Sequence, residues 1–431
     1  MRHEQRCMPS VKRILCAAGL ALAIAALPAG AQEYKLGIVT FLSGQAAGPF
    51  GIPAKNAAEL TIDAINAGTL PAPYNTKGIA GMPVKMLLVD ENGGPSKQVT
   101  EYRNLVDRDK ADAVIGYVSS GDCLAIAPVA DELKKLTILF DCGAPRVLEE
   151  KPYQYLFRTR PHGAMDNVAA ARYIADIMPN VKKINGINQN YAWGQDSWED
   201  FTKSMAKFKP GTEIGTSQMP KLGAGTYSSE ISALLLSDAA LVHSSFWGAD
   251  LESFVQQGKA RGLFDKQLLV LTAGEPSMFR MADTIPDGTV IGARGPFGVF
   301  APDNALNRWF RDAYQKKYDS PPSYASYVMA QAILGLKAAA EKAMQKNKKP
   351  SGDEIVAALE NLTFEAPSGT VRMSLAKGHQ AVQENAIGRF KLQGGKATLV
   401  DVKRYPAECV NPPEGMTAVK WIEAGFPGAK C

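Results

Sequence analysis

The feature that most constrains the fold is a regular alternation of short apolar runs with amphipathic runs. Residues 34–42, 84–89 and 111–118 are rich in β-branched side chains and have the length of buried strands, whereas residues 54–67 carry apolar side chains at helical spacing. Repeated β–α–β units place their strands parallel, because each helix carries the chain back to the start of the next strand. The predicted fold class is therefore α/β with doubly wound parallel sheets, which bind ligands at the carboxyl ends of their strands.

The alternation occurs twice along the chain. A first series ends near residues 153–159, and a second runs from the expected strand at 183–188 to the one at 268–272. A chain of 431 residues is too long for one typical core and has the length of two domains. We therefore expect two Rossmann-like lobes, each with its own sheet.

The first 31 residues have the pattern of a signal peptide. A basic start is followed by an apolar run over 14–27 and by Ala29-Gly30-Ala31, which provides a small-residue cleavage site. We expect the mature chain to begin at Gln32 and to be exported to the periplasm. Removal of these residues lowers the formal charge from +5 to +2, which gives no reason to expect a nucleic-acid partner.

Four cysteines remain in the expected mature chain, an even number that suits an oxidising compartment. We predict a Cys123–Cys142 disulfide, because both residues follow the ends of consecutive parallel strands. We predict a second between Cys409 and Cys431, which would tie down a tail rich in Pro and Gly. The cysteines lack C-x-x-C spacing and the three remaining histidines are far apart, so no metal or cofactor is expected.

Two serines stand where an expected strand turns into an expected helix. Ser119 and Ser120 follow the strand-like run 111–118 and precede apolar residues at helical spacing over 123–133. The free backbone N–H groups of a helix start, together with two hydroxyls, suit a carboxylate. The alternative is that one serine is only the helix N-cap, with Asp122 favouring the helix dipole.

Several short motifs occur in an order that resembles one known family, the type I periplasmic solute-binding proteins of the leucine/isoleucine/valine-binding group. The motifs are residues 36–43 followed by Gly44, Asp63-x-Ile65-Asn66, Asp112-x-Val114-Ile115-Gly116 with Ser119-Ser120-Gly121, Ala127-Pro128-Val129-Ala130, and Phe157-Arg158-Thr159. The resemblance covers residues 34–400. It implies a receptor that delivers a small-molecule ligand to the membrane permease of an ABC importer, and we expect it to act as a monomer.

The resemblance also implies two lobes joined by a three-crossover hinge, with the ligand held between them. By that pattern lobe 1 comprises residues 33–159 and 293–368. Lobe 2 comprises residues 160–292 and 369–431.

Carried over position by position, the resemblance assigns the ligand contacts to nine residues. The carboxylate falls on Ser120, with Ser119 and the backbone of Gly121 beside it. A backbone contact falls on Gly143 and Ala144. The remaining positions are the aromatic Phe50 near the first loop, Trp193 and Trp247 in the second lobe, and Glu275, where an acidic residue pairs with a ligand ammonium.

The sequence departs from the amino-acid binders of this family at two kinds of position. Pro145 replaces a hydroxyl residue and has no N–H, while Trp193 and Trp247 replace the usual tyrosines. We therefore predict a hydrophobic or aromatic carboxylic acid as ligand. The alternative ligand is a branched-chain amino acid, if Glu275 pairs with its ammonium. Both tryptophans also have a purely structural alternative in packing between the lobes, and Glu275 has one as a solvated turn residue.

We do not expect an enzyme. The run Gly116 to Gly121 resembles a nucleophile elbow, but that motif requires glycine two positions before the serine, where Tyr117 and Val118 stand. Neither a Walker loop nor a G-x-G-x-x-G motif follows the first expected strand. The sensing part of a signalling receptor is a third possibility, disfavoured because we find no transmembrane run or output domain in the sequence.

Overall fold

The structure, a computed structural model, describes Met1, residues 32–345 and residues 350–431. The expected signal peptide lies outside the described residues, apart from Met1. The described residues from Glu33 to Cys431 form one compact unit, and everything below concerns it.

The first sheet has eight strands in the order β11-β12-β13-β5-β4-β3-β1-β2. Strands β1 to β5 run parallel to one another, β13 pairs parallel with β5, and β12 pairs antiparallel with both β11 and β13. The bounds are β1 (Tyr34–Thr40), β2 (Val84–Asp90), β3 (Ala113–Gly116), β4 (Thr137–Leu139), β5 (Leu156–Arg158), β11 (Thr363–Ala366), β12 (Gly369–Leu375) and β13 (Gln380–Val382).

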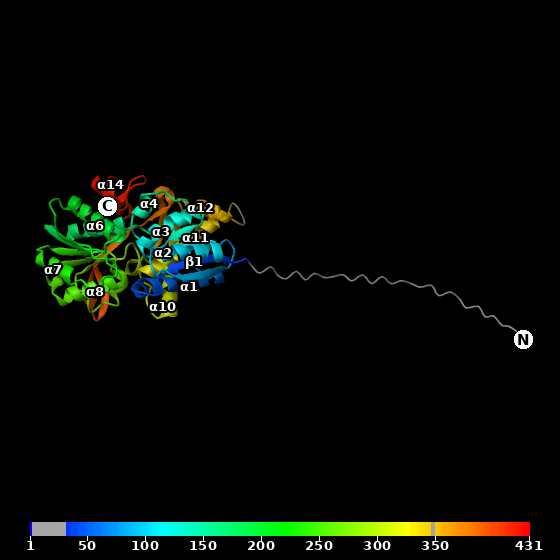
Figure 1. The fold of residues 1–431 in the computed structure, drawn as a ribbon, viewed down its shortest axis with the longest axis horizontal. Helices are drawn as coiled ribbons and strands as arrows, with labels where there is room; N and C mark the ends of the chain where they lie inside the picture. Colours follow the sequence, from blue (N-terminus) through cyan, green and yellow to red (C-terminus); the bar gives the residue numbers. More distant parts are fainter. Residues whose placement is uncertain (2–31, 346–349) are drawn as a thin grey trace. The chain divides into compact units, whose positions relative to one another are not determined.

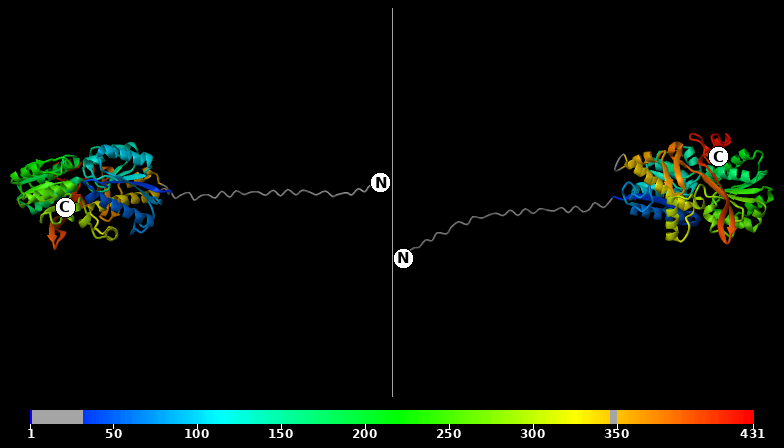
Figure 2. Two further views of the ribbon diagram at one scale, coloured as in Figure 1. Left: turned by 60° about the horizontal axis from the view of Figure 1, so that its bottom comes forward. Right: turned by 180° about the vertical axis from the view of Figure 1, so that it is seen from behind.

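The second sheet has seven strands in the order β15-β14-β10-β9-β8-β6-β7. Strands β6 to β10 are parallel, and β14 pairs antiparallel with both β10 and β15. Strands β14 and β15 form the long orange hairpin in Figure 2. The bounds are β6 (Lys183–Ile187), β7 (Glu213–Gln218), β8 (Leu241–Ser244), β9 (Leu268–Leu271), β10 (Val290–Gly292), β14 (Asn385–Gln393) and β15 (Lys396–Tyr405). Two α/β lobes with mostly parallel sheets confirm the predicted fold class.

Helices cover both sheets (Figure 1). Around the first lie α1 (Ile52–Ala67), α2 (Pro95–Arg103), α3 (Ser120–Glu132), α4 (Arg146–Glu149), α10 (Ala305–Tyr318), α11 (Tyr324–Met344) and α12 (Gly352–Leu359). Around the second lie α5 (Gly163–Ile177), α6 (Ala192–Phe208), α7 (Ser228–Leu236), α8 (Gly248–Ala260), α9 (Glu275–Met278), α13 (Ala407–Val410) and α14 (Ala418–Glu423). Among the described residues, no helix is both long and apolar enough to cross a bilayer.

Local sequence explains where individual helices start and stop. α12 begins with a capping box in which the Ser351 hydroxyl accepts from the Glu354 N–H and the Glu354 carboxylate accepts from the Ser351 N–H. α1 ends at Gly68, whose φ of 70° is a left-handed conformation that glycine adopts without strain. α11 is buried along almost its whole length, because its alanine-rich sequence is apolar on every side and packs against both α1 and α12.

The chain passes between the two sheets three times, after β5, after β10 and after β13. We expected residues from 369 onward to belong to lobe 2, but β12 and β13 lie in the first sheet. The reason is the short turn at residues 367–368, which folds β12 back onto β11 as an antiparallel hairpin within the same sheet. The last boundary between lobe 1 and lobe 2 therefore lies at residues 383–384, between β13 and β14, and not at residues 368–369. The other lobe boundaries stay a prediction.

Both predicted disulfides are confirmed. Cys123, in the first turn of α3, is bonded to Cys142, which follows β4, and their Cα atoms are 6.5 Å apart. Cys409, in α13, is bonded to Cys431, with Cα atoms 4.7 Å apart. The second bond connects the last residue of the chain to the buried part of lobe 2.

Candidate ligand-binding site

A small cavity lies where the strands of both sheets end, and residues of both lobes line it. Its volume is about 10 Å³, which is room for about one water molecule. We call it the cleft cavity. Its lining consists of Phe50, Val118, Ser120, Gly143, Tyr191, Trp193, Trp247, Ala273 and Arg294.

Five of the nine predicted contact residues line the cleft cavity, namely Phe50, Ser120, Gly143, Trp193 and Trp247. Ser119, Gly121 and Ala144 adjoin lining residues in the chain without lining the cavity themselves, and Glu275 lies elsewhere. The other four lining residues, Val118, Tyr191, Ala273 and Arg294, were not among the nine predicted contacts. The roles of all nine residues in binding stay predictions.

Ser120 is the first residue of α3, which starts four residues after β3 ends. Its Oγ accepts hydrogen bonds from the backbone N–H groups of Gly143, at 3.2 Å, and Ala144, at 3.1 Å. A hydroxyl has two acceptor positions and one proton, so both acceptor positions are occupied and the proton is left to donate. The side chain of Ser120 therefore offers one donor to the cleft cavity.

Glu91 already occupies part of the expected carboxylate site. Its buried carboxylate accepts from the backbone N–H groups of Val118, at 2.8 and 2.9 Å, and Ser119, at 2.8 Å. Burial, together with the nearby Asp122, raises the pKa of Glu91 well above its usual value, and the two N–H groups oppose this rise. A carboxylate of the protein thus satisfies the backbone donors just before α3.

Two tryptophans form the aromatic wall on the side of lobe 2. Trp247, just before α8, meets Phe50 edge-on with ring centroids 5.7 Å apart, and its Nε1 donates to the Tyr191 hydroxyl at 2.9 Å. Trp193, in the first turn of α6, donates from Nε1 to the Ser245 carbonyl oxygen at 2.9 Å. Each indole is thus fixed by one hydrogen bond at its edge.

Gly143 is required by the close approach of the Arg294 and Trp193 side chains. A Cβ at this position would lie 2.0 Å from Arg294 Nη2 and 2.4 Å from Trp193 Cζ3. Neither distance is possible for a real side chain without movement of the arginine or the indole. The fit of the two lobes around the cleft cavity thus depends on the absence of a side chain at residue 143.

Arg294 is the positively charged side chain among the residues that line the cleft cavity. It stands two residues after β10 with φ of 58°, and its guanidinium carbon lies 4.3 Å from the centroid of the Trp193 ring. Its Nη1 donates to Asp141 Oδ1 at 2.7 Å and to the Tyr324 hydroxyl at 2.9 Å. Its Nε lies 3.4 Å from Asp166 Oδ2. The signal in the sequence was its place just past a strand end, where parallel sheets concentrate binding residues.

Asp141 retains one unused acceptor. Its Oδ1 accepts from Arg294 and from the Tyr324 hydroxyl, but its buried Oδ2 has no hydrogen-bond partner among the described residues. Burial raises the pKa of Asp141, and the guanidinium groups of Arg294 and Arg160 oppose that rise.

Glu275 does not face the cleft cavity. Its carboxylate accepts from the backbone N–H of Tyr324, at 2.9 Å, and of Val299, at 3.4 Å, so it caps the start of α11. The side chain is fully buried, so it is not a solvated turn residue. Burial raises the pKa of Glu275 to about 8, opposed by the Val299 N–H.

Comparison with known proteins decides the family. The family model described as "Periplasmic binding protein" matches residues 33–396. The chain belongs to the periplasmic binding protein family. A curated relative, an "Amino acid binding protein" of Pseudomonas aeruginosa, is 25% identical to this chain over 243 residues. That match covers 52% of this chain and 64% of the relative, which is less than two thirds of the relative's length.

Solved structures of periplasmic binding proteins share the fold. A solute-binding protein of an ABC transporter from R. palustris, solved in complex with benzoate, superimposes with a TM-score of 0.75 at 22% identity, covering 89% of this chain and 99% of that one. A leucine-binding protein from Thermotoga maritima gives a TM-score of 0.72 at 15% identity, covering 85% and 98% of the two chains. At such identities the likeness shows the fold, and it includes binders of both ligand classes considered above.

Proposed function

We propose that this periplasmic binding protein is the extracytoplasmic receptor of an ABC importer, and that it captures a small hydrophobic or aromatic carboxylic acid between its lobes. It acts as a monomer, is exported with cleavage before Gln32, and passes its ligand to the membrane permease. One observation carries the choice of ligand. The cleft cavity combines the hydroxyl proton of Ser120 with aromatic walls, and Glu275, the expected ammonium partner, is turned away from it.

The polar groups of the cavity favour an anion over a zwitterion. Ser120 supplies a hydrogen-bond donor and Arg294 a guanidinium, whereas Pro145 lies outside the lining and the Glu275 carboxylate is occupied by the start of α11. A buried ammonium without a partner costs several kcal/mol, far more than a small ligand gains from one extra contact. A carboxylic acid without an amino group avoids this cost.

The apolar groups favour a flat ligand. Phe50, Trp193 and Trp247 present ring faces and edges to the same small space. Each aromatic pair adds about 0.5–1.5 kcal/mol beyond the burial of its area, and a branched aliphatic side chain gains no such term. An aromatic acid therefore uses these walls better than leucine does.

A ligand enters only if the lobes separate, because the cavity in this structure holds about one water molecule. The three passages between the sheets allow such a hinge motion, since few covalent connections link the lobes. The structure thus corresponds to a closed arrangement of the two lobes. Binding of benzoate would stop closure at a slightly wider separation.

A branched-chain amino acid is the second candidate ligand, and one observation favours it. Asp141 Oδ2 is a buried carboxylate oxygen without a partner, and Arg294, which lines the cavity, contacts the other oxygen of the same carboxylate. If opening of the lobes exposed this oxygen, it could accept from a ligand ammonium. The curated relative described as an amino acid binding protein adds weight to this candidate.

A thermal-shift screen tests the proposal. The panel contains benzoate, 4-hydroxybenzoate, cinnamate, leucine, isoleucine and valine, each at the same concentration. A ligand present at a hundred times its Kd adds about 2.7 kcal/mol, which for a chain of this length raises Tm by about 3 °C. We expect such a shift with at least one aromatic acid and none with the three amino acids. Shifts with the amino acids alone would establish the second candidate instead.

A further inference from the structure

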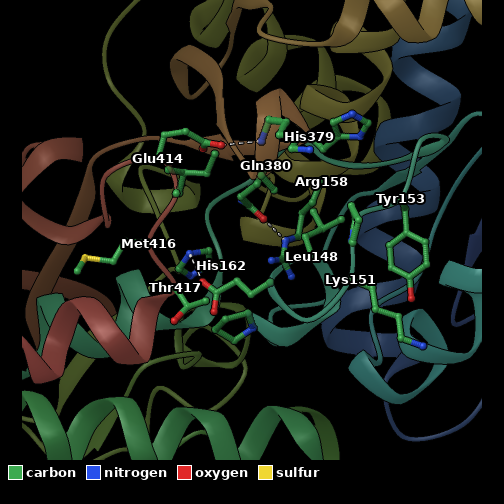
Figure 3. Close-up of a pocket in the computed structure, with 17 residues that line it drawn as sticks. Leu148, Lys151, Tyr153, Arg158, His162, His379, Gln380, Glu414, Met416 and Thr417 are labelled. Carbon is green, nitrogen blue, oxygen red and sulfur yellow. Dashed lines mark hydrogen bonds and ion pairs between the residues drawn. The ribbon is translucent and has the colours of Figure 1, made fainter.

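A second and larger cavity lies apart from the cleft cavity. Its volume is about 350 Å³, within the range of small-molecule sites. We call it the back pocket, and it is lined among others by Leu148, Glu149, Arg158, His162, Leu375 and Met416 (Figure 3). The back pocket and the cleft cavity share no lining residue.

The back pocket is built by segments that are distant in sequence. The region around α4, the end of β5 and the turn before β13 form one side, and residues 414–417, just before α14, close the other (Figure 3). The Cys409–Cys431 disulfide and the bond from the Ala418 N–H to Glu149 Oε1, at 2.9 Å, hold the C-terminal segment in place. The pocket is therefore a defined feature of the fold.

Arg158 lines this pocket with an unused donor group. The side chain is fully buried, its Nε donates to Gln380 Oε1 at 2.5 Å, and its Nη1 donates to the carbonyl oxygens of Cys142, at 3.0 Å, and Ala144, at 2.8 Å. Its buried Nη2 has no hydrogen-bond partner in the described part of the chain. A buried cationic donor without an acceptor is costly, so an anion that reached it would be bound favourably.

His162 lines the same pocket and is equally without partners. Its side chain is 1% exposed, and neither ring nitrogen has a hydrogen-bond partner among the residues described. The carboxylate of Glu149 lies close by, with its Oε1 3.8 Å from Nε2. Burial lowers the pKa of His162 well below its usual value, and the positive charges of Arg158 and Arg160 lower it further. The neutral ring offers one N–H donor.

The rest of the lining suits an amphipathic anion. Leu148, Leu375 and Met416 provide apolar surface. Cationic side chains outnumber anionic ones, with Arg158, Lys151 and Lys377 against Glu149 and Glu414. Burial raises the pKa of Glu149 to about 7, so near neutral pH part of its negative charge is absent.

We propose that the back pocket is a second binding site, for a small carboxylic acid with an apolar body. The carboxylate accepts hydrogen bonds from Arg158 Nη2 and from the His162 ring, and the apolar body packs against Leu148, Leu375 and Met416. The site goes beyond the proposed transport function and does not depend on it, because the two cavities are separate.

Hexanoate is the probe, and isothermal titration calorimetry is the measurement. A ligand of eight non-hydrogen atoms is expected to bind with a Kd of about 0.1–1 mM. Hexylamine, which has the opposite charge, is expected to show no binding. Hexanoate binding with this Kd that a substitution in the back pocket weakens supports the proposal, and absence of hexanoate binding or tighter binding of hexylamine overturns it.

Substitutions locate the site. Met416 is partly exposed and lines the back pocket, so Met416→Trp fills the pocket and should weaken hexanoate binding at least about tenfold. Met219 is also partly exposed but lines neither cavity, so Met219→Trp should leave binding unchanged. Lys151→Glu reverses an exposed charge of the lining and should weaken binding several-fold, whereas Lys396→Glu, outside both cavities, should not. Circular dichroism checks that each variant is folded. If Met416→Trp does not fold, Lys151→Glu still tests the site.

Ser120→Ala separates this proposal from the proposed transport function. Ser120 lines the cleft cavity and not the back pocket, so hexanoate binding in the back pocket should survive this substitution. Hexanoate binding that is lost in Ser120→Ala and unchanged in Met416→Trp would place the ligand in the cleft and overturn the second site.

Discussion

Replacement of Ser120 by alanine removes one oxygen that serves two purposes. In the folded protein that oxygen accepts from the backbone N–H groups of Gly143 and Ala144, both buried. Each buried donor left without an acceptor costs about 1–3 kcal/mol, so the loss of the acceptor of two donors in Ser120→Ala should lower the free energy of unfolding by about 2–6 kcal/mol. The lost hydroxyl proton is also the proposed donor to the ligand carboxylate. A hydrogen bond to a charged group is worth about 1.5–3 kcal/mol, so the Kd should rise roughly ten- to a hundredfold.

Two measurements separate these effects. Urea unfolding without ligand gives the change in stability, and calorimetric titration with benzoate at a temperature where the variant is folded gives the change in Kd. Ser119→Ala is the matched control, because the Ser119 side chain does not line the cavity and its backbone N–H, which the substitution keeps, donates to Glu91. We expect its Kd to change less than about threefold. A folded Ser120→Ala variant with unchanged affinity, or an equal loss in the control, would refute the assigned geometry.

Three further predictions concern closure, pH and the C-terminal disulfide. Gly143→Ala places a methyl group against the side chains of Arg294 and Trp193, which should prevent the lobes from closing. Small-angle scattering should therefore show no decrease in the radius of gyration of this variant when ligand is added. A decrease equal to that of the native protein would contradict the packing argument. Burial raises the pKa of Glu275 from its usual 4.5 to about 8, so the folded chain retains a proton that the unfolded chain has lost, and stability falls as pH rises through this window. Glu275→Gln cannot titrate and so removes this dependence. In urea titrations, the unfolding free energy of the native protein minus that of the variant should fall by about 3 kcal/mol from pH 5 to pH 7. A difference that does not change with pH would count against the buried carboxyl group. Joint replacement of Cys409 and Cys431 by serine opens a loop with a sequence separation of 22 residues and should lower the unfolding free energy by about 2–4 kcal/mol, which an unchanged urea midpoint would disprove.

The sequence predicts most of the fold because strand and helix periodicities are local properties. The alternation over residues 34–272 gives two sheets, and the pairing of Cys123 with Cys142 follows from consecutive parallel strands. The assignment of β12 to a lobe failed for a physical reason. Its pattern of alternately buried residues is the same in either sheet, and only the short turn to β11 determines which sheet it joins.

The candidate site is predicted only in part. Phe50, Ser120 and Trp193 come together because the topology of parallel sheets brings strand ends to one place. The direction of Glu275 depends on a tertiary contact, the N–H of Tyr324, which no local pattern reveals. Arg294 was missed for a similar reason, since its partners Asp141 and Asp166 are more than a hundred residues away in sequence.

The central claim is that the cleft binds an aromatic carboxylic acid in preference to a branched-chain amino acid. The most direct test is calorimetric titration of the purified protein with benzoate and with leucine in the same buffer. We predict micromolar or tighter binding of benzoate and binding of leucine at least about a hundredfold weaker, because leucine would bury its ammonium without a partner. Micromolar binding of leucine together with no binding of benzoate would contradict this account and point to Asp141 as the ammonium partner.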